Sequence, residues 1–532
     1  MKIKNTVILT LASAIMLSNT AFSQVLNEGT FKIGRTLSLI DAYYVDTTNL
    51  DKLTETIIID MLRNLDPHST YISAKDVRDM NEPLQGNFEG IGIQFNLLYD
   101  TIIIIEPISG GPSEKVGLLA GDRIIAINGE KVTGISISTT GVRSRLMGPK
   151  GSSVNLNIFR KGEKEILDFT IIRDKIPINS LDAAYMLDRE TGYVKLNKFA
   201  ATTEKEFEEA LAGLKMNNMK NIIIDLRNNG GGYMIAATDL ANNFFSNSNL
   251  LVYLIGRKTP RQDYKSTGTG TLSASRVVVL VDEGSASSSE IFAGALQDWD
   301  RGVILGRRTF GKGLVQNQYW LTDGSMIRLT IARYYTPTGR SIQSPYSEGY
   351  DKYVQNFYKR FSTGEMVSPD SVHLPDSLKY KTLINKRTVY GGGGIMPDIF
   401  VAADTANYSD YYRNLVRKGI MNLFVLEYAD KNRVRINDEF KSFEDFKARF
   451  QFTPEEIQSF IDKGEKEGVK YNETQFRISE SEMLMILKAL VANNIWQTNE
   501  YFRIINEEDN VIRRALEIIS NRDTYNSILG YK

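Results

Sequence analysis

The chain of 532 residues contains no cysteine and only two histidines, His68 and His373. Without cysteine it has no disulfide framework, no cysteine nucleophile and no thiolate ligand for zinc or an iron–sulfur cluster. Two histidines leave little material for a histidine-based catalytic triad. For His68, which lies in the proline-containing stretch LDPHSTYIS (65–73), a role in a turn is favoured over a catalytic role.

Net charge is also absent, because 64 lysines and arginines balance 64 aspartates and glutamates. The composition therefore gives no basic footprint for a nucleic acid, and we expect no nucleic-acid partner. Nothing in the sequence calls for a metal or another cofactor. Hydrophobic residues make up 42% and charged residues 24%, which is ordinary for a soluble protein. The length predicts three or four domains with cores of their own.

Long hydrophobic runs are missing, and the one short run is at the start of the chain. Residues 1–23 have a lysine-containing beginning, an apolar stretch at 7–17, and the small residues Ala21 and Ser23 before Gln24. This pattern is typical of a cleaved signal peptide. A retained membrane anchor is the alternative, and a lipid anchor would need a cysteine. We expect an exported, periplasmic protein that is soluble once this segment is removed.

The rest of the chain changes character several times, which predicts a multidomain α/β protein. Residues 24–85 have helical spacing, whereas 86–175 read as a compact module of strands with one or two helices. Strands and helices alternate over 176–405, which is typical of an α/β layer fold. A polar, irregular insertion is predicted at 344–390. Residues 406–532 are mostly helical.

A candidate nucleophile follows a buried strand in the segment GSASSSE (284–290). A small-residue turn between a strand and a helix can expose a hydroxyl at the carboxyl edge of a sheet, where free helix N–H groups suit an oxyanion. The alternative is structural, because Ser287 and Glu290 have the spacing of a capping box. The segment is also not a G-x-S-x-G elbow, since residue 288 is serine.

Two glycine-rich segments complete the set of candidate loops. GRRTFGKG (306–313) is one residue from a P-loop, but Gly313 replaces the hydroxyl residue that binds magnesium, so phosphate binding is disfavoured. DLRNNGGG (225–232) could bring backbone N–H groups close to a substrate, or could be a plain tight turn. A serine nucleophile needs a base. Lys312, between two glycines, could serve if burial keeps its amine neutral.

Taken together, these segments resemble the carboxy-terminal processing proteases, also called tail-specific proteases, which are exported Ser–Lys peptidases with a PDZ domain. The resemblance covers about residues 28–405. It rests on these motifs in order: LDPHSTY (65–71), GIGI (90–93), GPSEKVGLLAGDRIIAINGEKV (111–132), DLRNNGGG (225–232), GSASSSEIFAGALQDW (284–299), TFGKGLVQ (309–316), YYTPTGRSIQ (334–343) and GIMPD (394–398).

The resemblance implies a serine-type endopeptidase with a crotonase-like βα protease core. It places the nucleophile on Ser287, the general base on Lys312, and a glutamine that orients the lysine on Gln316. The implied oxyanion donors are the N–H groups of Ser288 and Gly231. Ser288 is a departure from the family pattern, because many members have alanine there.

The resemblance also implies acidic support and a tail-binding module. Glu290 and Asp298 match acidic positions around the family site. The PDZ-like module would bind the C-terminal tail of a protein or peptide substrate, with apolar residues preferred, by adding the tail to a sheet edge. The loop that takes the tail carboxylate would be Gly90, Ile91, Gly92 and Ile93.

Two questions stay open at the level of sequence. A non-catalytic PDZ scaffold that only binds protein C-termini is the alternative to a protease. The helical residues 406–532 could form a homo-oligomer contact, dock an adaptor or cover the active site.

Overall fold

The computed structural model describes residues 28–404 and 406–531. The predicted signal peptide, residues 1–23, lies outside the described residues. Among the helices that are described, none combines the length and the apolarity needed to cross a membrane. The chain divides into two compact units, Met1–Tyr71 and Ile72–Lys532.

The described part of the first unit is helical, as predicted. It contains α2 (Glu28–Tyr43) and α3 (Leu50–Arg63). The side chain of Asn49 begins α3 by accepting a hydrogen bond from the Lys52 N–H at 2.9 Å. After α3, one carboxylate oxygen of Asp66 accepts the N–H group of His68 at 2.8 Å, so His68 lies in a turn that an aspartate closes.

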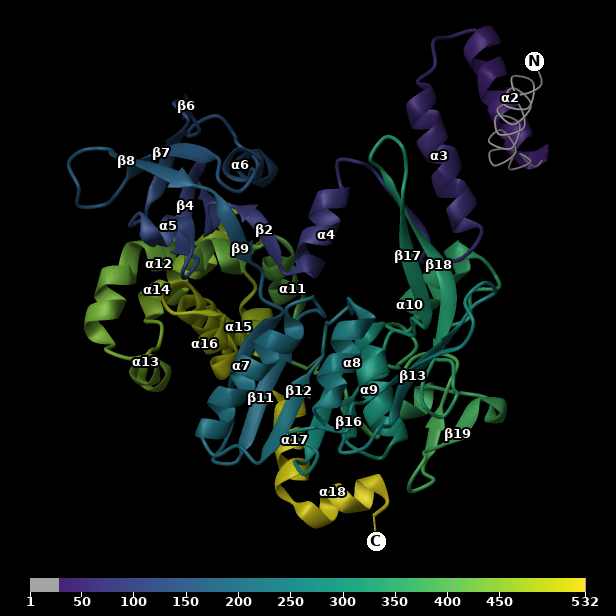
Figure 1. Ribbon diagram of the computed structural model, residues 1–532. Helices are drawn as coiled ribbons and strands as arrows, with labels where there is room; N and C mark the ends of the chain where they lie inside the picture. Colours follow the sequence, from purple (N-terminus) through teal and green to yellow (C-terminus); the bar gives the residue numbers. More distant parts are fainter. Residues whose placement is uncertain (1–27, 405, 532) are drawn as a thin grey trace, which may run out of the picture. The chain divides into compact units, whose positions relative to one another are not determined.

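The second unit begins with helix α4 (Val77–Gln85) and the small β module (Figure 1). Its main sheet has the order β3–β4–β5–β7–β8, with β3 at an edge. A separate ribbon pairs β2 with β9. The elements are β2 (Asn87–Gly90), β3 (Ile93–Leu98), β4 (Thr101–Pro107), α5 (Pro112–Lys115), β5 (Arg123–Ile127), β6 (Glu130–Lys131), α6 (Thr139–Leu146), β7 (Ser153–Phe159), β8 (Leu167–Ile172) and β9 (Asp174–Pro177).

A six-stranded sheet forms the centre of the β/α core, in the order β10–β11–β12–β15–β16–β21. Strands β11, β12, β15, β16 and β21 run parallel, and β10 is antiparallel to β11. The parallel strands are continuous apolar runs because both faces of this sheet are covered. The strands are β10 (Leu181–Met186), β11 (Thr191–Leu196), β12 (Asn221–Asp225), β15 (Val277–Val281), β16 (Val303–Gly306) and β21 (Ile399–Phe400).

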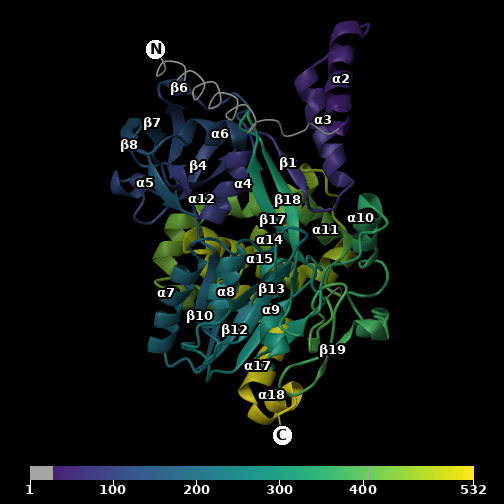
Figure 2. The ribbon, with the colours of Figure 1, turned by 45° about the vertical axis from the view of Figure 1, so that its right-hand side comes forward.

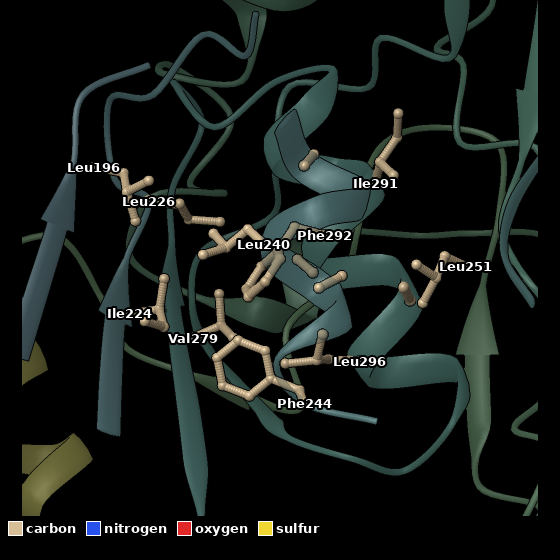
Figure 3. Close-up of a cluster of buried hydrophobic side chains, with 14 of the residues drawn as sticks. Leu196, Ile224, Leu226, Leu240, Phe244, Leu251, Val279, Ile291, Phe292 and Leu296 are labelled. Atoms are coloured by element: carbon tan, nitrogen blue, oxygen red, sulfur yellow. The ribbon is translucent and has the colours of Figure 1, made fainter. Parts of the chain in front are cut away.

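Helices cover the two faces of this sheet. On one face, α7 (Thr203–Met216), α8 (Met234–Asn242) and α9 (Ser288–Asp298) bury a core in which Leu240, Phe244 and Phe292 meet Ile224 and Val279 of the strands (Figure 3). On the other face lie α17 (Asn510–Ser520) and α18 (Arg522–Leu529). The last two helices of the predicted C-terminal helical region therefore complete the β/α core.

A second, antiparallel sheet lies beside the core and contains a long hairpin. Strand β18 (Met326–Tyr335) pairs with β17 (Leu314–Trp320) and with β13 (Leu250–Ile255), which pairs in turn with β14 (Gln262–Lys265). The hairpin of β17 and β18 can also be followed in Figure 2, where the molecule is turned by 45°. The sequence predicted an irregular insertion at 344–390, but part of it is regular. It contains α10 (Tyr350–Lys359) and a small hairpin of β19 (Lys379–Lys381) and β20 (Thr388–Tyr390).

Six further helices form a core of their own and hold the small β module. They are α11 (Asp410–Arg417), α12 (Ile420–Glu439), α13 (Phe443–Arg449), α14 (Pro454–Lys466), α15 (Glu473–Ile495) and α16 (Thr498–Ile505). From α12, Leu426 packs on Leu98 and Ile103 of the module. An ion pair of 2.7 Å joins Arg123 to Asp430 beside this contact.

Candidate active site

Ser287 lies at the carboxyl edge of the parallel sheet, between β15 and α9. Its backbone has φ of 55° and ψ of −112°, a region that non-glycine residues rarely occupy. Such strain costs on the order of 1–3 kcal/mol and is typical of functional sites. The neighbouring Ser288 is the first residue of α9, and its N–H group has no hydrogen-bond acceptor among the described residues.

Lys312 reaches the same edge from the next parallel strand. The loop after β16 carries Lys312, which is half-buried, and leads directly into β17. The Lys312 amine donates to Gln316 Oε1 at 3.1 Å. The Gln316 side chain is thus within hydrogen-bond distance of the amine.

The buried carboxylate of Glu290 joins the serine loop to the lysine loop. Glu290 Oε2 accepts the N–H groups of Ser287 at 2.8 Å and of Lys312 at 2.9 Å. The other oxygen, Oε1, accepts the Gly311 N–H at 2.7 Å and the Thr309 hydroxyl. Burial raises the pKa of Glu290 to about 7, although all four hydrogen bonds act to lower it. One oxygen atom thus contacts two peptide nitrogens that are 25 residues apart in sequence.

Tyr334 makes a second link between the two loops. Its hydroxyl lies 3.1 Å from the carbonyl oxygen of Ser287 and also within hydrogen-bond distance of the Lys312 carbonyl oxygen. The ring is buried, and burial raises the pKa of the hydroxyl well above its usual value, with the Glu290 carboxylate adding to the effect. Tyr334 stands in the motif YYTPTGRSIQ, but the sequence does not assign it a role because both loops are remote along the chain.

The glycine loop after β12 packs directly on the serine. Gly231 has φ of 99°, and a Cβ atom at this position would lie 2.8 Å from Ser287 Cβ. Only glycine fits this close approach. In this conformation the Gly231 N–H donates to Asn229 Oδ1 at 2.9 Å, and its carbonyl oxygen accepts the Phe199 N–H. Of the two predicted oxyanion donors, Ser288 is available here and Gly231 is engaged by Asn229.

One cavity of about 510 Å³ collects the predicted catalytic residues. Its lining includes Ser287, Ser288, Lys312, Gln316 and Gly231. Within residues 28–404 and 406–531, no three His, Asp or Glu side chains are grouped so that they could hold a metal ion. The arrangement is suited to acyl transfer by a serine hydroxyl with an amine as its base.

The geometry rules out a P-loop at 306–313. A P-loop leads into a helix and uses its free backbone N–H groups to hold phosphate. Here the segment leads into strand β17, and the N–H groups of Gly311 and Lys312 already donate to Glu290.

A second cavity, of about 490 Å³, lies along the edge strand β3 of the small β module. Ile91, Gly92 and Ile93 line it, together with apolar side chains that include Phe95 and Leu146 of α6. The N–H groups of Ile91 and Gly92 have no acceptor in the part of the chain that the structure describes. Gly90 ends β2, where it pairs with Asp174, and does not line this cavity.

Three parts of the chain match known protein families. Residues 190–348 match peptidase family S41, residues 90–171 match the PDZ domain, and residues 411–497 match a family of unknown function. These matches define a serine-type peptidase that carries a PDZ domain.

Two relatives carry the assignment further. The carboxy-terminal-processing protease of Bartonella bacilliformis is 36% identical over 320 residues, which are 59% of this chain and 72% of that protein. The carboxy-terminal processing protease CtpB of Bacillus subtilis is 35% identical over 314 residues, which are 58% of this chain and 65% of that protein. The chain belongs to the carboxy-terminal processing protease family. Among solved structures, a photosystem II D1 C-terminal processing protease is 30% identical, covering 58% of this chain and 89% of its own, with a TM-score of 0.32.

The predicted multidomain α/β class is confirmed: a helical N-terminal segment, a PDZ domain, an S41 protease core and a helical C-terminal region. The exact domain limits stay predictions.

Proposed function

We propose that this protein is an endopeptidase that cleaves peptide bonds with Ser287 as nucleophile and Lys312 as general base, after its PDZ domain has bound the C-terminal tail of the substrate. The observation that carries the proposal is the shared contact of the Ser287 and Lys312 N–H groups with one oxygen of Glu290. The Ser287 contact belongs to the capping box of α9, and the Lys312 contact ties the lysine loop to the same oxygen.

The proposed reaction uses groups that line one cavity. The neutral amine of Lys312, held by Gln316, takes the proton of the Ser287 hydroxyl as its oxygen attacks the scissile carbonyl carbon. The Ser288 N–H stabilises the oxyanion, and the Gly231 N–H joins it once it leaves Asn229. The protonated Lys312 then gives its proton to the leaving amine. Water, activated by the same amine, hydrolyses the acyl-enzyme.

Tail recognition takes place at the edge strand of the PDZ domain. The tail adds to β3 as a further strand, its carboxylate accepts the N–H groups of Ile91 and Gly92, and its apolar side chains enter the cavity beside Phe95 and Leu146. This arrangement supports a preference for protein or peptide substrates with apolar C-terminal residues.

Two further parts of the proposal rest on sequence. The lysine-containing start and short apolar run of residues 1–23 support export to the periplasm with removal of this segment. For the helical region, contact with a second copy of the chain or with an adaptor is a proposal for the surface of α11–α16 that faces away from the PDZ domain.

The test is cleavage of an unfolded protein that ends in an apolar tail by the purified chain. We expect Ser287→Ala and Lys312→Ala each to lower kcat by on the order of 10⁴-fold or more, because members of a catalytic unit fail together. Both variants should still bind a tail peptide. Full activity in either variant would overturn the dyad, and tail binding by the wild type without any product would favour the scaffold.

A further inference from the structure

An arginine without a partner lines the catalytic cavity. Arg328 lies on β18, is partly buried, and contributes to the lining of the cavity that holds Ser287 and Lys312. Among the residues that the structure describes, no carboxylate forms an ion pair with it, and its fully buried Nη2 atom has no hydrogen-bond partner. Burial lowers the pKa of Arg328, and the smaller opposing effect of Tyr233 does not offset it.

Two buried arginines of this protein, Arg340 and Arg360, pair with carboxylates, and a third, Arg173, donates to backbone carbonyl oxygens. Arg340 lies 2.7 Å from Asp298, and Arg360 lies 2.8 Å from Glu365. An arginine stays charged in proteins, and a charge removed from water without a partner is costly. A guanidinium left unpaired in a substrate cavity therefore points to an anionic group that arrives with the substrate.

The strand register gives the distance between Arg328 and Gln316 along the hairpin. Gln316 pairs with Thr330 and Gln318 pairs with Arg328 across the hairpin, so these four residues share one face. Two residues along a strand span about 7 Å. Measured along the hairpin, Arg328 therefore lies about 7 Å from the Gln316–Thr330 pair. Gln316 accepts the hydrogen bond of the Lys312 amine.

The hairpin also offers an edge along which a substrate can lie (Figure 1). Strand β17 pairs only with β18 among the described strands, and Gln316, Asn317 and Gln318 all line the cavity. In a peptide extended along β17, the residue beside Arg328 would be about two residues away from the residue beside Gln316.

We propose that Arg328 binds a carboxylate of the substrate within about three residues of the scissile bond. The carboxylate is either the side chain of an aspartate or glutamate, or the terminal carboxylate of a short tail being removed. This inference rests on the proposed peptidase activity and adds a selectivity that the PDZ domain does not provide.

The experiment measures kcat/KM on internally quenched peptides with the full chain. In one arm, aspartate and asparagine are compared at each of three positions on both sides of the scissile bond, with the same apolar tail throughout. In the other arm, peptides that end one to three residues beyond the scissile bond carry a free carboxylate or an amide. We expect wild type to prefer the acid at one position by on the order of 10-fold or more, and the responding arm identifies the source.

Variants then assign the preference to one side chain. In Arg328→Gln the ratio of acid to neutral substrate should fall to about one, and Arg328→Lys should keep part of it. The matched control is Arg333→Gln, an exposed position on the same strand that does not line the cavity. It should keep the whole preference. Since the ratio is measured within each variant, it does not depend on how much of that variant folds.

Each outcome decides the inference. Equal cleavage of acid and neutral peptides by wild type, or a preference that survives in Arg328→Gln, would overturn it. An equal loss of preference in Arg333→Gln would assign the effect to general charge. If wild type cleaves no peptide at all, the proposed peptidase activity itself fails.

Discussion

The strained backbone of Ser287 predicts an inverted order of stability between two inactive variants. At an ordinary position in a helix or strand, a variant with glycine is less stable than one with alanine by about 0.5–1 kcal/mol, because glycine has more conformational freedom in the unfolded chain. At Ser287, alanine keeps a Cβ atom at φ of 55°, whereas glycine adopts this conformation without strain. We therefore expect Ser287→Gly to be more stable than Ser287→Ala.

The magnitude follows from two opposing terms. Relief of strain is worth about 1–3 kcal/mol, and the extra entropy of unfolded glycine subtracts about 0.5–1 kcal/mol. The glycine variant should gain roughly 1 kcal/mol in free energy of unfolding over the alanine variant. For a domain of this size, that raises Tm by about 2–4 °C.

Differential scanning calorimetry of both variants, on the transition that contains the protease core, measures this difference. A parallel pair at Ser246, a serine in the polar loop between α8 and β13, serves as the control, because Ser246 is not among the positive-φ positions. There the alanine variant should be the more stable. An alanine variant that is also the more stable at Ser287 would refute the strain argument.

Three further predictions concern Glu290 and the PDZ loop. Glu290→Gln should lower kcat at least tenfold with a smaller change in KM, because the amide oxygen can still accept from Ser287 and Lys312 whereas the amide NH2 group cannot accept from Gly311 and Thr309. A rise in KM with kcat unchanged would contradict this role. Because burial raises the pKa of Glu290 from 4.5 to about 7, its contribution to stability is full below pH 4.5 and falls by about 3 kcal/mol as pH rises through 7. Denaturation of wild type and Glu290→Gln at pH 5 and pH 8 should show this divergence, and parallel curves would count against it. Gly92→Ala, whose Cβ would lie 2.9 Å from Ile176, should reduce kcat/KM for substrates with an apolar tail and spare tail-less ones; equal losses would place the effect outside tail binding.

The sequence predicted most of the protease core because its signals are local. Buried strands such as β12 and β15 are short apolar runs that end in glycine- and serine-rich turns. Parallel neighbours place those turns at one sheet edge, where Ser287, Lys312 and Gly231 line one cavity. In the sequence, it was the family resemblance that grouped these three residues. The order of the family motifs along the chain supplied the remaining assignments.

What the sequence did not predict depends on contacts between distant segments. Tyr334 acts on two loops that lie 47 and 22 residues away, and the periodicity of its own strand carries no sign of it. In the sequence, Arg328 is one charged residue of the segment that forms the hairpin of β17 and β18. Only the structure shows that its buried Nη2 atom has no hydrogen-bond partner among the described residues. Helices α17 and α18 have the same amphipathic pattern as their neighbours, yet they cover the protease sheet.

The most direct test of the central claim is the reaction of the chain with a fluorophosphonate, which phosphonylates a serine only when a base activates it. Peptide mapping by mass spectrometry should find one adduct, on Ser287, and the rate of labelling should collapse in Lys312→Ala. An adduct on Ser288 instead, or an unchanged rate without the lysine, would contradict the assignment of nucleophile and base.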